Sequence, residues 1–371
     1  MNILIVKLSA LGDVIHTLPA LTALRRAHPT ARINWLIEAT AAPLVLGHPA
    51  LDQALVWQRR QFTGALRSGH WLRALGLLRS FVRELRAVRY DLVLDFQALL
   101  KSAVWVALAR GVRKVGFGRG MARSEGSYLF LNERVPAVSM EVHALDRGLM
   151  LLEAIGIPRG TVVYDLPIPP ETRRQADALL RDAGIGPHER YVALHPRTRW
   201  PTKQWCPERF AAVADALPGL DCRAVFTGAP EDQRGVDEVF ACLKRPAVRL
   251  DGKLDLKTLA ALFQRASLVV STDTGPMHLA AAVNTPVVAI FGPTAPQRTG
   301  PHGPRHKVVR AAVACSPCFS RQCRSSVAEE MACMKRIEAV EVIRAIRELL
   351  TETATGSGCG SRAVAQELRS S

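Results

Sequence analysis

The chain shows the same pattern twice: a short apolar run leads into a polar loop and then into a helical stretch. The first run covers residues 2–6 and the second covers 191–194. After each opening, further apolar runs of strand length alternate with helical stretches. Such alternation predicts a parallel sheet covered by helices on both faces. Because the pattern starts afresh near the middle of the 371 residues, we expect two α/β domains.

The expected elements follow from these runs. The first half is predicted to contain strands at 2–6, 33–37, 92–94 and 112–117, with helices at 64–88 and 99–109. The second half is predicted to contain helices at 171–183, 207–217, 231–243, 255–265, 276–283 and 337–350, with strands at 191–194, 223–226, 248–250, 268–271 and 287–291. A Gly/Pro-rich zone between them predicts domains 1–170 and 171–350, then a flexible polar tail at 351–371. The last helix could pack back on the first domain.

Positive charge is concentrated in the first half. The chain has 49 Lys+Arg against 33 Asp+Glu, a net +16, and residues 59–123 hold fourteen basic against three acidic residues, or +11. This segment could bind anionic lipid, a phosphorylated acceptor or nucleic acid, or could be a solvated arginine-rich face. It lacks the aromatic stacking motif of RNA-binding modules, which disfavours a nucleic-acid-binding protein.

Neither a membrane span nor a signal peptide is expected. Apolar runs fall short of the ~20 residues that a span needs. Lys7 and Asp13 interrupt the apolar opening, unlike a signal-peptide core. We therefore expect a cytoplasmic protein.

Asp13 ends the loop after the first strand and stands at the start of the next helix. Its carboxylate could cap that helix by accepting hydrogen bonds from free backbone N–H groups. Alternatively, it could face a ligand as a general base. Ligands of doubly wound sheets bind at the carboxyl ends of the strands, where this loop lies. Spacing alone leaves both roles open.

The loop at 271–282 in the second half is dense in groups that can bind an anion. Asp273, Thr274 and Gly275 precede Pro276, which favours the first position of a helix, and His278 lies in the first turn. Free N–H groups at such a helix start suit a diphosphate. An ordinarily capped helix is the alternative.

Two more strand-end loops add donors and acceptors. Residues 195–205 include Thr198 and Lys203, which can hold phosphates, and Glu231 or Asp232 could accept hydrogen bonds from ribose hydroxyls. A P-loop, a full GxGxxG and an Asp-x-Asp are absent from the sequence. A leaving diphosphate would therefore have to be neutralised by helix N-termini and basic side chains.

Four cysteines form a cluster in sequence: Cys315, Cys318, Cys323 and Cys333. They could form a structural zinc or iron–sulfur site, or they could remain reduced and without a metal. The cluster lacks the second CxxC of a typical zinc ribbon, so its spacing does not decide between the two.

Several segments, taken in order, resemble the ADP-heptose:lipopolysaccharide heptosyltransferases, family 9 of the glycosyltransferases. They are IVKLSALGDVIHTLPAL (5–21), DFQALLKSA (95–103), MARSEGS (121–127), HALDR (143–147), HPRTRWPTKQW (195–205), TGAPED (227–232), STDTGPMHLAAA (271–282) and FGPTAP (291–296). The resemblance implies a GT-B fold, in which two Rossmann-like domains face each other across a cleft. It also implies inversion at the sugar carbon, without a metal or cofactor.

The same resemblance implies an ADP-heptose donor, a Kdo-lipid A acceptor, peripheral contact with the inner membrane and no nucleic-acid partner. It places the catalytic base at Asp13. Its donor-site residues correspond here to Thr198, Lys203, Glu231, Asp232, Asp273, Thr274, Gly275 and His278. Its acceptor-site residues correspond to Ser9, Gly12, Arg59, Arg60, Gln97, Lys101, Arg123 and Arg147. The loop at 195–205 is one residue longer than usual, with Arg197 where a threonine is usual, so another nucleotide sugar or acceptor is the alternative.

Overall fold

The computed structural model describes residues 1–121, 125–324, 326 and 328–356, with side chains described up to Glu352. These residues divide into two compact units, Met1–Pro167 and a second that begins at Ile168. Each unit is built on one six-stranded parallel sheet. Arg123 and residues 357–371 of the expected tail lie outside the described residues.

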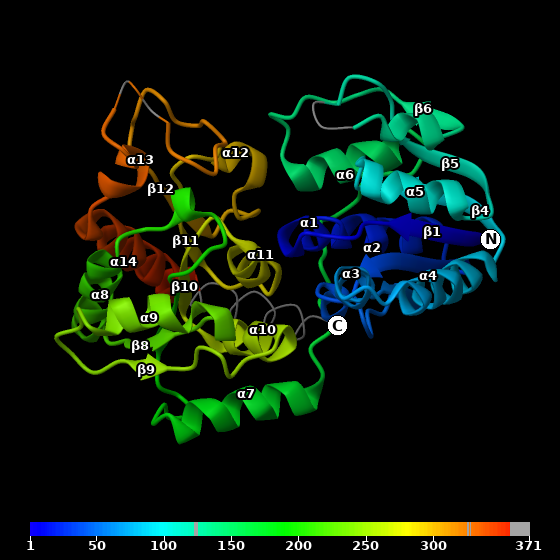
Figure 1. The fold of residues 1–371 in the computed structure, drawn as a ribbon. Helices are drawn as coiled ribbons and strands as arrows, with labels where there is room; N and C mark the ends of the chain where they lie inside the picture. The colour runs from blue at the N-terminus through cyan, green and yellow to red at the C-terminus, as the bar shows by residue number, and fades with distance from the viewer. Residues whose placement is uncertain (122–124, 325, 327, 357–371) are drawn as a thin grey trace, which may run out of the picture. The chain divides into compact units, whose positions relative to one another are not determined.

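The sheet of the first unit has the strand order β3-β2-β1-β4-β5-β6 (Figure 1). Its strands are β1 (Asn2–Val6), β2 (Arg32–Glu38), β3 (Gln53–Trp57), β4 (Tyr90–Asp95), β5 (Gly111–Phe117) and β6 (Glu133–Val135). Its helices are α1 (Leu11–Ile15), α2 (Leu18–Ala27), α3 (Arg59–Arg67), α4 (Trp71–Arg86), α5 (Leu100–Leu108) and α6 (Ala144–Glu153). α4 contacts α5 and α2 contacts α6, so helices cover the sheet in two pairs.

The second sheet repeats this order in its own strands, β9-β8-β7-β10-β11-β12. Its strands are β7 (Tyr191–His195), β8 (Arg223–Phe226), β9 (Val248–Arg249), β10 (Leu268–Thr272), β11 (Val287–Ile290) and β12 (His306–Val309). Its helices are α7 (Pro170–Asp182), α8 (Pro207–Ala216), α9 (Gln233–Phe240), α10 (Leu256–Arg265), α11 (Gly275–Ala282), α12 (Pro296–Thr299), α13 (Ala332–Lys335) and α14 (Ala339–Gly356). The last helix, α14, packs on α8 and on β10, β11 and β12 of the second unit.

The central strands follow directly from their apolar sequences. β1 (NILIV) and β10 (LVVST) lie in the interior of their sheets, and nearly all of their residues are buried. A parallel strand covered by helices on both faces needs such a continuous apolar run. The edge strands β3, β6 and β12 were not predicted, because half-solvated edges lack this run.

The single helix expected at 64–88 is wrong. The structure has α3 and α4 instead, separated at residues 68–70. Gly69 lies between them with φ +72°, a left-handed conformation that L side chains rarely adopt and that commonly ends a helix. α3 also begins earlier than expected, at Arg59.

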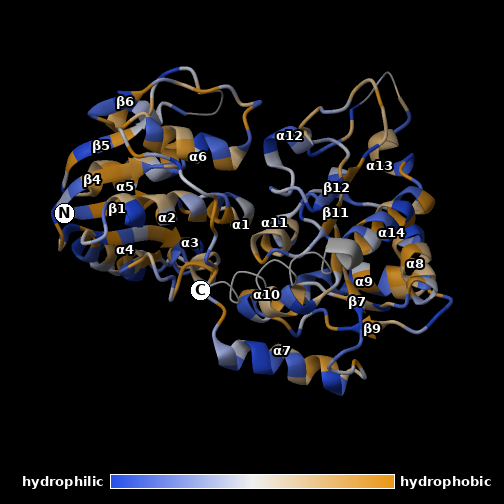
Figure 2. Cartoon of the chain, turned by 180° about the vertical axis from the view of Figure 1, so that it is seen from behind, coloured by the Kyte–Doolittle hydropathy of each residue, from blue (hydrophilic) through white to orange (hydrophobic). Residues whose placement is uncertain are grey.

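An aromatic cluster ties α4 to its sheet. The rings of Trp57, Phe81 and Trp105 lie 4.9–5.0 Å apart, centroid to centroid. Phe81 and Leu85 of α4 are buried, whereas much of the rest of the helix is exposed. Figure 2 shows hydrophobic and hydrophilic residues alternating along α4. The inner face of α4 is therefore fixed by packing, and its outer face remains in solvent.

A search for membrane-spanning segments found none: within the described ranges, every helix is too short or too polar to cross a bilayer.

Candidate functional site

Each sheet has a point where the strand order reverses, between β1 and β4 in the first and between β7 and β10 in the second. Loops that leave the carboxyl ends of two such strands turn to opposite faces of the sheet. The crevice between them is where open α/β sheets bind ligands. The residues predicted to bind or react follow these strands, so each unit is described at its own reversal point.

Asp13 lies in α1, directly beyond the loop that follows β1. Its Oδ2 accepts a hydrogen bond from the Ala10 N–H at 3.1 Å, so the carboxylate does cap its own helix. A carboxylate offers about four lone-pair positions, and this bond uses one of them. Asp13 is half-buried. Capping and action as a base are therefore compatible at this position.

The loop after β4 holds the loop after β1. Gln97 Oε1 accepts hydrogen bonds from the backbone N–H groups of Leu8 and Ser9 at 3.0 and 3.2 Å. Lys101 Nζ donates to Ser9 Oγ at 2.5 Å. The structure thus brings Ser9, Gln97 and Lys101 together, close in sequence to Gly12 and Asp13. These contacts fix the loop in which the predicted base stands.

Glu38, at the end of β2, forms ion pairs with two of the predicted acceptor-binding residues. Its carboxylate lies 3.6 Å from Arg59 Nη1 and 3.9 Å from Lys101 Nζ. Arg60 is exposed beside Arg59 at the start of α3. Arg147, in α6, donates to Met140 Sδ at 2.5 Å. Sequence analysis assigned no role to Glu38, because a carboxylate at the end of a strand does not indicate which distant cations it meets in the fold.

Lys7 and Asp95 are also missing from the prediction, although both lie at the reversal point. Lys7 Nζ donates to the Phe96 carbonyl at 3.0 Å. Burial lowers the pKa of Lys7, while the charges of Asp13 and Asp95 oppose that effect. Asp13, the predicted base, and Asp95 thus both act electrostatically on the buried Lys7 side chain. The sequence does offer a signal for Lys7, because it is a charged residue that directly follows the apolar strand β1.

Asp95 is almost fully buried, with 1% of its surface exposed. Burial raises its pKa to about 6, although its carboxylate accepts hydrogen bonds from Ala98 N, Ser102 Oγ and Gln97 N. In the unfolded chain the pKa returns to 3.8. Between pH 4 and 6 the folded protein therefore binds a proton that the unfolded chain releases, so stability falls as pH rises through this window.

We expect the ionised Asp95 carboxylate to cost about 3 kcal/mol of folding stability at pH 7. Asp95→Asn removes this charge, so the stability of wild type relative to the variant should fall by about that amount between pH 4 and 7. Denaturant unfolding at several pH values measures the difference. A difference that stays constant across this range would contradict the assignment.

In the second unit, Lys203 and Asp273 meet across the reversal point. Lys203 Nζ lies 2.6 Å from Asp273 Oδ2, and Thr294 Oγ1 donates to the same oxygen at 2.7 Å. Both side chains are largely buried, at 14% and 6% exposure. The Lys203 ammonium also lies over the Trp200 ring, 4.4 Å from its centroid. Asp273 thus positions a cation at the carboxyl ends of β7 and β10.

Helix α11 begins directly after this aspartate. Thr274 is its N-cap residue, in an extended conformation and without a side-chain capping hydrogen bond, and Gly275 and Pro276 open the helix. Pro276 has no N–H group and the Met277 N–H donates to the Thr274 carbonyl, so the Gly275 N–H and the helix dipole are what this helix start offers to an anion beside Lys203. His278 is buried one turn into the helix. This helix start and Lys203 together form the candidate anion site of the second unit.

The remaining predicted donor residues lie on neighbouring strand ends. The Thr198 carbonyl accepts a hydrogen bond from Gln204 Nε2 at 3.2 Å, which folds the loop after β7 on itself. Asp232 Oδ2 accepts from Ala229 N at 2.9 Å and so caps the turn after β8. Glu231, next to it, is exposed and lies 4.0 Å from Arg199.

The four clustered cysteines of the sequence act on one another in the second unit. Within the described ranges, no three His, Cys, Asp or Glu side chains are gathered so that they could hold a metal ion. Cys315, Cys318, Cys323 and Cys333 are all free. Burial raises the pKa of Cys333 to about 11, and the other three thiols add to the rise. The four thiols therefore interact with one another in the fold, and the metal-bound and metal-free forms of the cluster both stay predictions.

The protein consists of two Rossmann-like units, because its two doubly wound sheets have the same strand order. The reversal point of the first sheet carries carboxylates and cations, and that of the second carries a lysine beside a helix N-terminus. Comparison with known proteins identifies its family. Residues 78–328 match the family model described as Glycosyltransferase family 9 (heptosyltransferase). The chain belongs to this family.

A curated relative is lipopolysaccharide heptosyltransferase 1 of Pseudomonas aeruginosa, 33% identical over 339 residues that make up 89% of each chain. Among solved structures, a glycosyl transferase family 9 protein from Veillonella parvula has a TM-score of 0.79 at 25% identity, covering 95% of this chain and 97% of that one. The E. coli heptosyltransferase WaaC with ADP has a TM-score of 0.72 at 27% identity, covering 94% and 100%. The expected family and Rossmann-like fold are thereby confirmed.

Proposed function

We propose that this protein transfers heptose from ADP-heptose to the Kdo-lipid A inner core of lipopolysaccharide. One observation carries the proposal: a largely buried lysine, Lys203, is held by Asp273 beside the N-terminus of α11 at a strand reversal point. Its chemistry fits a nucleoside diphosphate. The relatives support the same assignment, since one is named for lipopolysaccharide heptosyltransfer and another was solved with ADP.

In the proposed mechanism, the first unit binds the anionic acceptor and the second binds the donor. Asp13 takes the proton from the acceptor hydroxyl as that oxygen attacks the anomeric carbon and the bond to the diphosphate breaks. The transition state resembles an oxocarbenium ion, so a nearby carboxylate also stabilises it by charge.

The departing ADP is stabilised by the Lys203 ammonium and by the N–H group and dipole at the start of α11. Glu231 or Asp232 binds the ribose. On the acceptor side, Arg59, Arg60, Lys101 and Arg147 face Kdo carboxylates and lipid A phosphates, with Ser9, Gly12 and Gln97 shaping the loop. Direct attack on the donor inverts the anomeric carbon. With Lys203 and the start of α11 neutralising the diphosphate, turnover should be unchanged in excess EDTA.

Product analysis with ADP-heptose and a Kdo-bearing acceptor tests this function. We expect one heptose added and ADP released, with inverted anomeric configuration in the NMR spectrum of the product. A calorimetric screen of other nucleotide sugars tests the alternative donor. Tighter binding of another nucleotide sugar, with no transfer from ADP-heptose, would overturn the assignment within the family.

Because its proposed acceptor is a membrane lipid, the enzyme works at the periphery of the cytoplasmic face of the inner membrane. The net charge of +11 in residues 59–123 supports this location, since anionic lipid attracts basic surfaces.

A further inference from the structure

The outer face of α4 carries a stripe of exposed apolar and basic residues. Leu72, Leu75, Arg79, Arg83 and Arg86 follow one another at spacings of three or four, which places them on one side of the helix. Leu72 is 87% exposed and Leu75 is 40% exposed. From Leu72 to Arg86 the stripe runs about 21 Å along the helix.

The stripe has an apolar end and a cationic end. Trp71, 67% exposed, stands beside Leu72 at the start of the helix. At the other end, Arg79, Arg83 and Arg86 line a hollow of about 650 Å³ with Leu78 and Val82 at its base. Within the part of the chain that the structure describes, these three guanidinium groups take part in no ion pair or hydrogen bond. Both ends are therefore free to meet a partner.

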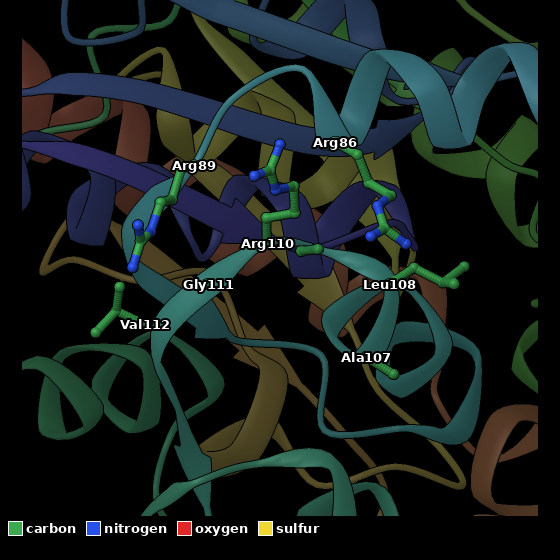
Figure 3. A pocket seen from close by; sticks show the side chains of 8 residues that line it. Arg86, Arg89, Ala107, Leu108, Arg110, Gly111 and Val112 are labelled. Carbon is green, nitrogen blue, oxygen red and sulfur yellow. The ribbon is translucent and has the colours of Figure 1, made fainter.

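A second hollow, of about 400 Å³, adjoins the first and shares Arg86 with it. Arg89 and Arg110 line it together with residues 107–109 at the end of α5 and residues 111–112 at the start of β5. Figure 3 shows the side chains of Arg86, Arg89 and Arg110 around this hollow. This second hollow lies at the amino ends of the strands, whereas Asp13 and Lys101 lie at their carboxyl ends. The hollow is therefore separate from the candidate acceptor site.

We propose that this face of α4, with Arg89 and Arg110, docks the enzyme on an anionic phospholipid surface. The proposal names the surface that would hold the enzyme at the membrane. It rests on the proposed function, because a membrane-embedded acceptor requires such contact. Tryptophan and leucine enter the interfacial layer of a bilayer, and arginines bind the phosphates beside them. The cationic end would repel a second copy of this chain, and the apolar end offers nothing to nucleic acid.

Vesicle flotation tests the cationic end. We expect wild type to bind vesicles that contain phosphatidylglycerol and to bind neutral phosphatidylcholine vesicles at least about tenfold more weakly. The variant with Arg79→Ser, Arg83→Ser and Arg86→Ser should lose at least about tenfold in affinity for the anionic vesicles. The matched control removes the same charge from exposed arginines of the second unit: Arg174→Ser, Arg181→Ser and Arg190→Ser. Equal losses in both variants would overturn the proposal.

Trp71 reports on the apolar end. Brominated lipids in the vesicles should quench part of the wild-type tryptophan fluorescence, and Trp71→Phe should remove that quenching. Leu72→Ser should weaken binding, and the exposed side chain makes it a safe test of the folded protein. Quenching that is unchanged in Trp71→Phe would contradict insertion at this end of the helix.

Transfer to a deacylated, soluble acceptor separates this proposal from the proposed function. The α4 arginine variant should transfer heptose to that acceptor at the wild-type rate while losing activity on vesicle-embedded acceptor. If wild type transfers no heptose to either acceptor, the proposed function fails. If the α4 arginine variant and the control variant of the second unit transfer heptose to the embedded acceptor at equal rates, the proposed docking surface is wrong instead. Strong duplex DNA binding that the same arginines control would favour nucleic acid and overturn the lipid assignment.

Discussion

Replacement of Asp13 by asparagine is expected to slow heptosyl transfer by about 10²–10⁴-fold while ADP-heptose still binds. Asparagine keeps the shape of the side chain, and its oxygen can still accept the hydrogen bond from Ala10 N that caps α1. The substitution therefore removes the base and leaves the local fold. The turnover number from ADP release and the donor affinity from calorimetry give the two quantities separately.

A matched control for Asp13 is Asp91→Asn. Asp91 is exposed on β4 of the same sheet and accepts a hydrogen bond from the backbone N–H of Asn2. Its loss should leave turnover unchanged. Near wild-type turnover in Asp13→Asn would remove Asp13 from the mechanism and leave only its capping role. A steep loss in both variants would point to general damage to the first unit.

Lys203→Ala should show the second large effect, a donor affinity at least about tenfold weaker, because a buried charged contact to a phosphate is lost. The same change leaves Asp273 buried with Thr294 as its remaining side-chain partner. Breaking a buried ion pair on one side typically costs about 3–5 kcal/mol, so the second unit should also be destabilised. Donor titration and denaturant unfolding measure the two effects.

A double variant separates these two consequences. Lys203→Ala combined with Asp273→Asn removes the uncompensated charge, so most of the lost stability should return. Donor affinity should remain weak, because the ammonium is still missing. Lys253→Ala, an exposed lysine of the same unit, serves as the control for charge alone. Unchanged donor affinity in Lys203→Ala would count against its contact with the diphosphate.

The sequence predicts the centre of each sheet well, whereas among the edge strands only β9 was predicted, and the reason is physical. β1 and β10 are buried on both faces, so their apolar runs are unmistakable. β3 and β12 are half-solvated edge strands, and their mixed residues resemble a loop. The break between α3 and α4 depends on the conformation of Gly69, because the flanking apolar spacing continues across it.

The candidate site is predicted to the same uneven degree. Loops after β1, β7 and β10 are recognisable because chemistry-bearing residues directly follow apolar strands. Pairings between distant residues are not recognisable: Lys7 contacts a carbonyl 89 positions away, and Lys203 meets Asp273 across 70. Both members of the second pair were predicted to lie near a diphosphate. Only the folded structure shows that Asp273 binds Lys203 directly.

The pairing of Lys203 with Asp273 has a consequence for the end of each catalytic cycle. Without nucleotide, the lysine is already neutralised by a carboxylate, so an incoming diphosphate exchanges one anion for another instead of meeting a bare cation. In the proposed mechanism, the Asp273 carboxylate pairs with the Lys203 ammonium again as ADP leaves. Such competition limits product affinity, so the enzyme should turn over without being trapped by its own by-product.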